Sequence, residues 1–124
     1  MKKLLMVSLI LAQQFAFADV DCYSPSAVVD GGYHVTVTGT SSNLTAIVNS
    51  AGIDNTNLAT VGPVQLYLLK KQPPIRVYHY SSKNISFRLN VDMEMTPGGN
   101  YPADFTLNTP DGSFTDELNC RVDR

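Results

Sequence analysis

The sequence predicts an all-β domain, either a small antiparallel β-sandwich or a closed up-and-down β-barrel of about seven or eight strands. Three observations indicate this fold. Short apolar–polar alternations recur along the chain, clusters of turn residues separate them, and no helical periodicity longer than a turn or two follows the first 18 residues. The only two cysteines stand near opposite ends of the chain, which favours a disulfide between its first and last segments.

Residues 1–18 have the layout of a secretory signal peptide. Two lysines precede an apolar run from Leu4 to Ala12, which is too short to cross a bilayer. Small residues at positions 16 and 18 then mark a cleavage site between Ala18 and Asp19. Cleavage there would leave a single all-β domain, residues 19–124. The alternatives for the leader are a buried amphipathic helix and a membrane anchor.

The residues before Cys22 do not fit a lipid-attachment site, because the preceding position holds Asp21 rather than a small residue. No second apolar run follows the leader. We therefore expect a protein that is not a lipoprotein, has no membrane span in its mature chain, and is found in a periplasm or outside the cell.

Export into an oxidising compartment would pair the two thiols. Two cysteines allow one intramolecular bond, Cys22 to Cys120, which would enclose nearly the whole mature chain. The bond requires the first and last strands to be neighbours, as in the closure of a barrel or the joining of two sheets. The alternatives are two free thiols and an intermolecular disulfide.

The clearest strand lies at residues 84–95, where apolar and polar side chains alternate without a break from Ile85 to Met95. This pattern is typical of a strand with one face on a core and the other in water. Shorter β-prone runs lie at 33–38, 44–49, 64–70, 75–80, 102–108 and 113–121. In the last of these, Asp116 falls on the apolar face, so we expect it to be paired or to lie near a barrel mouth.

Turn residues separate these runs. Gly31 and Gly32 precede the run at 33–38, residues 96–100 (TPGGN) reverse the chain, and residues 109–112 (TPDG) are a hairpin signal in which Gly112 takes a positive φ. Consecutive hairpins predict a meander, with the last three strands adjacent in sequence order.

Charge argues against one class of partner. Removing the leader takes away two lysines and no acid, which leaves seven basic against 11 acidic residues and shifts the net charge from −2 to −4. Nucleic acid binding requires a basic face that neutralises phosphates, so we expect no nucleic acid partner.

The search for chemistry finds no catalytic, metal or nucleotide motif, and we expect no enzyme activity and no cofactor. His34 and His79 stand at no ligand spacing from other ligand residues and are expected to be solvent-facing strand histidines. Two pairs of carboxylates could in principle do acid–base work, Asp92 with Glu94 and Asp116 with Glu117, but charge is expected on the outer face of a strand. Residues 52–57 read as a polar turn rather than as a calcium loop.

One basic and aromatic stretch, KKQPPIRVYHY, is the candidate partner-binding surface. Its residues are Lys70, Lys71, Arg76, Tyr78, His79 and Tyr80. The structural alternative is a hairpin loop with solvating lysines, followed by tyrosines that cover the edge of the core. Proline and lysine also protect edge strands from stray pairing, which requires no partner.

The sequence therefore predicts an exported, non-enzymatic β domain that binds a macromolecular partner, an unknown protein or envelope component, in the manner of an inhibitor or envelope interaction protein. Its size, leader and single disulfide resemble those of small periplasmic β-barrel proteins, including lysozyme-inhibitor-like barrels, and this resemblance assigns no residue roles. The alternatives are a carrier of a small apolar ligand, with Met93 and Met95 as cavity liners, and a hydrolase with an unrecognised site. The oligomeric state stays open.

Overall fold

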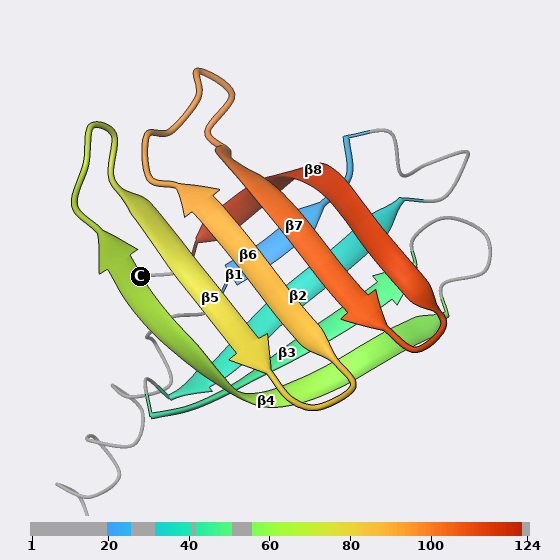
Figure 1. Cartoon of the computed structure of the whole chain (residues 1–124). Helices are drawn as coiled ribbons and strands as arrows, with labels where there is room; N and C mark the ends of the chain where they lie inside the picture. Colours follow the sequence, from blue (N-terminus) through green and yellow to red (C-terminus); the bar gives the residue numbers. More distant parts are fainter. Residues whose placement is uncertain (1–19, 26–31, 41, 51–55, 123–124) are drawn as a thin grey trace, which may run out of the picture.

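The computed structural model describes residues 20–25, 32–40, 42–50 and 56–122. These residues form eight antiparallel strands that follow one another around a closed barrel, with β8 returning to pair with β1 (Figure 1). The strands are β1 (Val20–Tyr23), β2 (Tyr33–Thr40), β3 (Asn43–Ser50), β4 (Asn57–Leu69), β5 (Ile75–Ser81), β6 (Ser86–Asp92), β7 (Tyr101–Thr109) and β8 (Gly112–Val122). The all-β prediction is confirmed, and the barrel, rather than the sandwich, is the observed form.

The predicted leader and its cleavage site lie outside the described residues. Within the described ranges, no helix has the length and apolar character needed to cross a bilayer.

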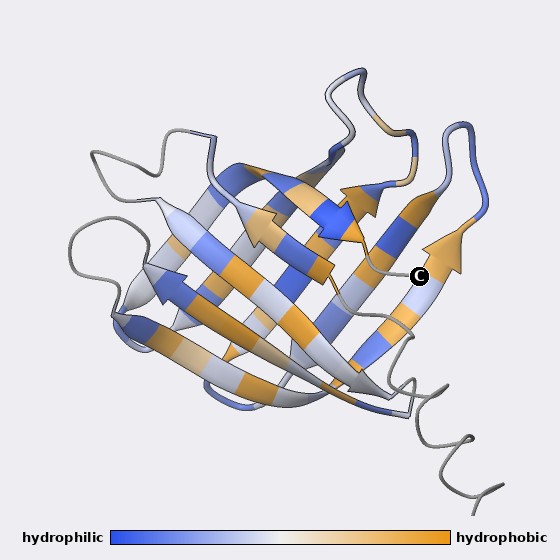
Figure 2. Ribbon diagram, turned by 180° about the vertical axis from the view of Figure 1, so that it is seen from behind, coloured by the Kyte–Doolittle hydropathy of each residue, from blue (hydrophilic) through white to orange (hydrophobic). Residues whose placement is uncertain are grey.

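The barrel interior is filled by side chains that alternate along the strands. In β6, Phe87, Leu89 and Val91 are fully buried, and their neighbours face outward. The same alternation appears as bands of hydropathy along the ribbons in Figure 2. The largest fully buried side chains of this interior are Tyr78, Phe87, Phe105, Leu44, Leu89, Leu107, Leu118, Val20, Val35, Val37 and Val48. A barrel of this strand number is narrow enough to be packed in this way.

β6 is shorter than the predicted strand at 84–95. The strand ends at Asp92, whose Oδ1 accepts a hydrogen bond from the backbone of Glu94 at 3.0 Å. The next amide, that of Met93, donates to the carbonyl of Pro74 on the β5 side at 2.9 Å, and the ladder with β7 has already ended at Val91 and Ala103. The apolar alternation at Met93 and Met95 therefore continues into a loop, where Met95 is 53% exposed.

Two long strands bend to close the barrel. β4 pairs first with β3 and then with β5. Between the pairs Ala46–Val61 and Leu44–Val64 the ladder shifts register, which places the bend at Gly62 and Pro63. β8 also curves, without a register shift, from its pairing with β7 to its pairing with β1 (Figure 1).

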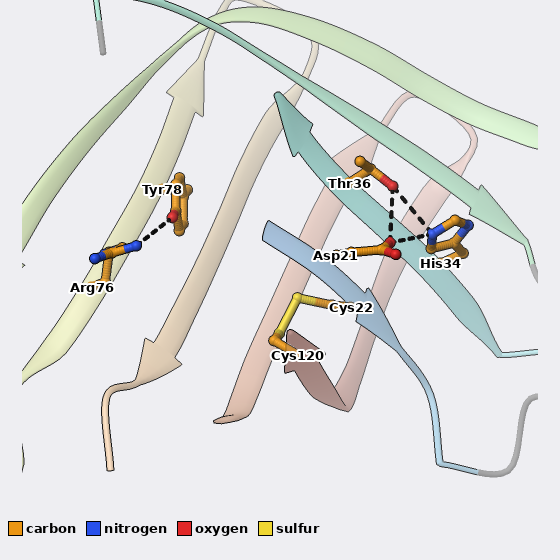
Figure 3. The surroundings of a disulfide bond; sticks show 7 residues. All are labelled: Asp21, Cys22, His34, Thr36, Arg76, Tyr78 and Cys120. Atoms are coloured by element: carbon orange, nitrogen blue, oxygen red, sulfur yellow. Dashed lines mark hydrogen bonds and ion pairs between the residues drawn. A yellow bond between two sulfur atoms is a disulfide. The ribbon is translucent and has the colours of Figure 1, made fainter. Parts of the chain in front are cut away.

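The disulfide joins β1 to β8, as predicted. Cys22 and Cys120 are direct partners across the β1–β8 ladder, their Cα atoms lie 4.0 Å apart, and both are fully buried in the core. The bond therefore fixes the contact between the first and last strands, where the barrel closes (Figure 3).

The predicted meander of the last three strands is also confirmed. At the hairpin between β7 and β8, Gly112 has a φ of 148°, which a residue with a side chain rarely adopts. Asp116 is a register partner of Phe105, on the inward face, and its Oδ2 accepts a hydrogen bond from Ser24 Oγ at 2.5 Å. The inward carboxylate is thus paired, as the sequence required.

Candidate functional site

The six residues of the predicted binding surface do not lie on one surface. Lys70 and Lys71 are exposed in the connection from β4 to β5. Tyr78, in contrast, is fully buried in the core and cannot contact a partner directly. Arg76 is half-buried, and its Nη1 donates a hydrogen bond to Tyr78 Oη at 3.4 Å (Figure 3).

The cause is the alternation of side chains along β5. Arg76 and Tyr78 lie on the inner side of the strand together with Tyr80, which packs partly buried against the core. His79 lies on the outer side and is half-buried. The stretch after Pro74 is therefore a structural strand, and only the two lysines remain as exposed members of the predicted surface.

The sequence analysis missed an apolar element directly before these lysines. Tyr67, Leu68 and Leu69 are 41%, 50% and 38% exposed and end β4. Only two other large hydrophobic residues of the described chain are comparably exposed, Tyr23 and Met95. We call residues 67–71 the β4 tip; it combines consecutive exposed apolar side chains with two cations.

The β6–β7 loop projects from the same end of the barrel as the β4 tip (Figure 1). The bases of the two loops are joined by the hydrogen bond from the Met93 amide to the Pro74 carbonyl. Met95, on the β6–β7 loop, adds a further exposed apolar side chain at this end. Exposed apolar groups that gather at one place on a protein surface are typical of interaction sites.

Charge is segregated around the barrel. Residues 55–91, which contain β4, β5 and β6 up to its last residue, include no aspartate or glutamate, and their cations are Lys70, Lys71, Arg76, Lys83 and Arg88. On the other side, Asp104 of β7 lies directly opposite Glu117 of β8. Together with Asp92, these acids line a hollow of about 440 Å³ on the outside of the sheet. The β4 tip thus belongs to the acid-free stretch 55–91, and the nearest acids along the neighbouring loop are Asp92 and Glu94.

A polar cluster on the outside of β1 and β2 is the second candidate (Figure 3). His34 Nε2 lies 2.5 Å from Asp21 Oδ1, and Thr36 Oγ1 lies 3.2 Å from the same nitrogen and 3.3 Å from the same oxygen. The ring of Tyr23 stacks on that of His34 at 4.2 Å between centroids. The cluster borders a hollow of about 580 Å³. His34 was not expected to have these neighbours. Asp21 and His34 lie far apart in the local sequence pattern and are brought together only by the pairing of β1 with β2.

The geometry of this cluster differs from that of a catalytic triad. In a triad, the carboxylate holds one ring nitrogen of the histidine and the hydroxyl nucleophile faces the other. Here Asp21 and Thr36 both approach Nε2, so the ring does not stand between them. The cluster is therefore a set of hydrogen bonds on the outer face of β1 and β2, and its geometry does not activate the Thr36 hydroxyl as a triad would.

In each of the two carboxylate pairs singled out in the sequence, the two members have different surroundings. Asp92 accepts a hydrogen bond from the Glu94 amide in a turn. Asp116 faces inward and is bonded to Ser24, whereas Glu117 faces outward and is exposed. No group of three or more metal-ligating side chains occurs among the residues that the structure describes.

No family model, no curated protein and no solved structure matches this chain.

Proposed function

We propose that this chain is an exported, non-enzymatic barrel domain that binds a macromolecular partner, a protein or an envelope component, through the β4 tip. One observation carries the proposal. Three consecutive apolar side chains, each between 38% and 50% exposed, precede two exposed lysines at one end of the barrel. Leaving this much apolar surface in water is unfavourable, and burial of it against a partner would recover about 25 cal/mol per Å² of apolar area.

Two further observations support binding at this end. The β4 tip and Met95 lie on loops tied together at their bases, which reduces the entropy lost when both contact a partner. The lysines of the β4 tip lie in the acid-free stretch 55–91, so an acidic partner would be favoured electrostatically.

The buried disulfide is compatible with a protein that functions in an oxidising compartment.

The other function classes have less support. The interior is packed with large side chains, which disfavours a carrier that encloses an apolar ligand. The His34 cluster lacks the two-sided histidine geometry that a hydrolase with a catalytic triad would use.

The test is capture of partners from periplasm, culture medium and envelope extract with four oxidised, mature baits. The first is the native protein. The second carries Lys70→Glu and Lys71→Glu, and the third carries Leu68→Ser and Leu69→Ser. The fourth, Lys83→Glu with Arg88→Glu, makes the same change of charge away from the β4 tip.

A partner held by the native and fourth baits, and lost by the second and third, is the expected result. Equal capture by all four baits would move the binding surface away from the β4 tip. Absence of any captured macromolecule would overturn the proposal.

A further inference from the structure

Among the residues that the structure describes, the second half of β4 has a strand neighbour on only one side. Residues 65–69 pair with residues 75–79 of β5, whereas the ladder between β3 and β4 ends at Leu44 and Val64. In the described part of the chain, a local bond from Lys71 N to the Leu69 carbonyl, 3.1 Å, is the only backbone hydrogen bond outside the ladders that involves these five residues. We call the other side of residues 65–69 the β4 edge; Figure 1 shows β4 at the margin of the front strands.

The β4 edge is not protected in the usual way. Exposed edges commonly carry charged side chains, proline or a bulge that discourages pairing with another chain. Residues 65–69 are Gln, Leu, Tyr, Leu and Leu, with no charge and no proline. The bulge and Pro63 lie before this segment, and Lys70 and Lys71 lie after it. Within the described part of the chain, five uncharged residues with β-strand geometry therefore lack a strand partner on this side.

There is also space beside the backbone at the start of the edge. A hollow of about 530 Å³ is bordered by Pro63, Val64, Gln65, Leu66 and Tyr67, and Ser42 of the β2–β3 connection lies at its rim. A strand that continued the sheet beyond β4 would enter this hollow. Its alternate side chains would lie beside Leu66 and Leu68 on one face and beside Tyr67 and Leu69 on the other.

We propose that the β4 edge receives one extended strand of a partner protein, and that the end of this strand beside Lys70 and Lys71 is acidic. The inference rests on the proposed function and specifies how binding occurs. In strand addition, main-chain hydrogen bonds supply affinity and the side chains on either face supply specificity. An antiparallel strand is favoured, and its N-terminal end would then lie beside the lysines.

Charge complementarity selects the occupant. Residues 55–91 contain five cations and no acid, so an acidic end is attracted to this part of the barrel. A second copy of this chain would bring the same uncharged edge and the same cations to the interface, so the two copies would not have complementary charges. The charge pattern therefore favours an acidic partner over self-association.

Because strand addition depends mainly on the backbone, a generic peptide tests it. The probe is acetyl-Glu-Glu-Val-Thr-Val-Thr-Val-amide, added to the mature, oxidised protein while amide hydrogen exchange is followed by NMR. A second peptide replaces both glutamates with lysine. A third has the acidic sequence with N-methyl groups on alternate residues, which removes donors from one side of the strand.

We expect the acidic probe to slow exchange of those amides in residues 65–69 that do not face β5. The lysine-ended probe should bind about tenfold more weakly, and the N-methylated probe should give no protection. Lys70→Glu with Lys71→Glu should reverse the preference between the acidic and basic probes, whereas Lys83→Glu with Arg88→Glu should leave it unchanged.

Two results would overturn the inference. The first is free exchange of residues 65–69 at millimolar acidic probe. The second is protection of the same amides without probe that increases with protein concentration, because a second copy would then occupy the edge. Loss of the strand-addition hypothesis can be told apart from loss of the proposed function. If a partner is captured through the β4 tip but the amides of residues 65–69 still exchange freely, the protein binds its partner without adding a strand.

Discussion

Ser24 is the buried polar side chain that connects three strands near one opening of the barrel. It is 4% exposed, follows β1, accepts a hydrogen bond from the Tyr33 amide at 2.7 Å and donates one to Asp116 at 2.5 Å. Both partners are only partly accessible to water, so each bond replaces hydration that would otherwise be lost. The inward position of Asp116 is tolerated because Ser24 supplies this donor.

The first prediction concerns this residue. Ser24→Ala removes an acceptor and a donor at once, and we expect the free energy of unfolding to fall by about 1–3 kcal/mol. The measurement is urea denaturation of the oxidised protein followed by circular dichroism. Ser82→Ala is the matched control, since Ser82 makes its bond to the Ile85 carbonyl in an exposed turn. An equal loss in both variants would contradict the role assigned to Ser24.

Residue-level patterns predicted some side chains and not others. Asp116 could be assigned because β8 carries one clear apolar face and the carboxylate interrupts it. Tyr78 could not, because each side of β5 carries both apolar and polar residues: Arg76 shares the side of Tyr78, and His79 shares the side of Val77. Neither side is therefore marked as outward, and the exposed part of KKQPPIRVYHY could not be separated from its buried part.

At the scale of elements, the strands with clean alternation were predictable, whereas the bent strand was not. The run at 64–70 is only the second half of β4, which begins at Asn57. Gly62 and Pro63 normally interrupt a strand, and here they are accommodated at a shift of register. The β4 edge is a consequence of that bend, so a feature that depends on long-range pairing could not be foreseen from local residue patterns.

The disulfide between β1 and β8 gives the second prediction. It closes a loop with a sequence separation of 98, and in the chain-entropy model such a loop contributes roughly 4 to 5 kcal/mol. Reduction of the native protein should therefore lower the free energy of unfolding by up to this amount without changing any side chain volume. Guanidinium denaturation with and without reductant measures the difference. Coincident transitions for the two forms would show that strand pairing alone holds β1 to β8.

The third prediction concerns the facing acids of β7 and β8. Asp104 and Glu117 are exposed, outward and directly opposite one another, and like charges in this position destabilise a sheet. No salt bridge to either acid occurs among the described residues. Glu117→Gln should therefore raise the free energy of unfolding by about 0.5 kcal/mol at low ionic strength.

Salt provides the control for this prediction. The gain from Glu117→Gln should shrink at high ionic strength, where surface charges are screened. Glu94→Gln, in the β6–β7 loop, should change the midpoint of unfolding little, because Glu94 has no register partner of like charge. A loss of stability in the Glu117 variant would imply that this carboxylate makes a favourable contact.

At the scale of the whole molecule, a filled barrel interior means that the proposed binding would use the outside of the barrel and its loops. The core is one cluster of buried side chains, contributed by all eight strands. The exposed apolar residues of β4 and the segregated charges are both external features. The exposed apolar residues lie beyond the bend, at the end of β4, and under the proposed function this surface is where a partner would gain most from contact.

The fourth prediction follows from the filled interior and the proposed export. Protein secreted from the full-length sequence should have the mass of residues 19–124 less two hydrogen atoms, and that mass should be the same under native and denaturing conditions. The predicted cleavage after Ala18 would remove the leader, the disulfide accounts for the two hydrogens, and we expect an interior filled by core side chains to hold no small molecule. Intact-mass spectrometry before and after reduction measures all three quantities in one preparation. An additional mass that disappears on denaturation would instead favour the carrier function. A mass that still includes residues 1–18 would contradict the proposed cleavage of the leader on export.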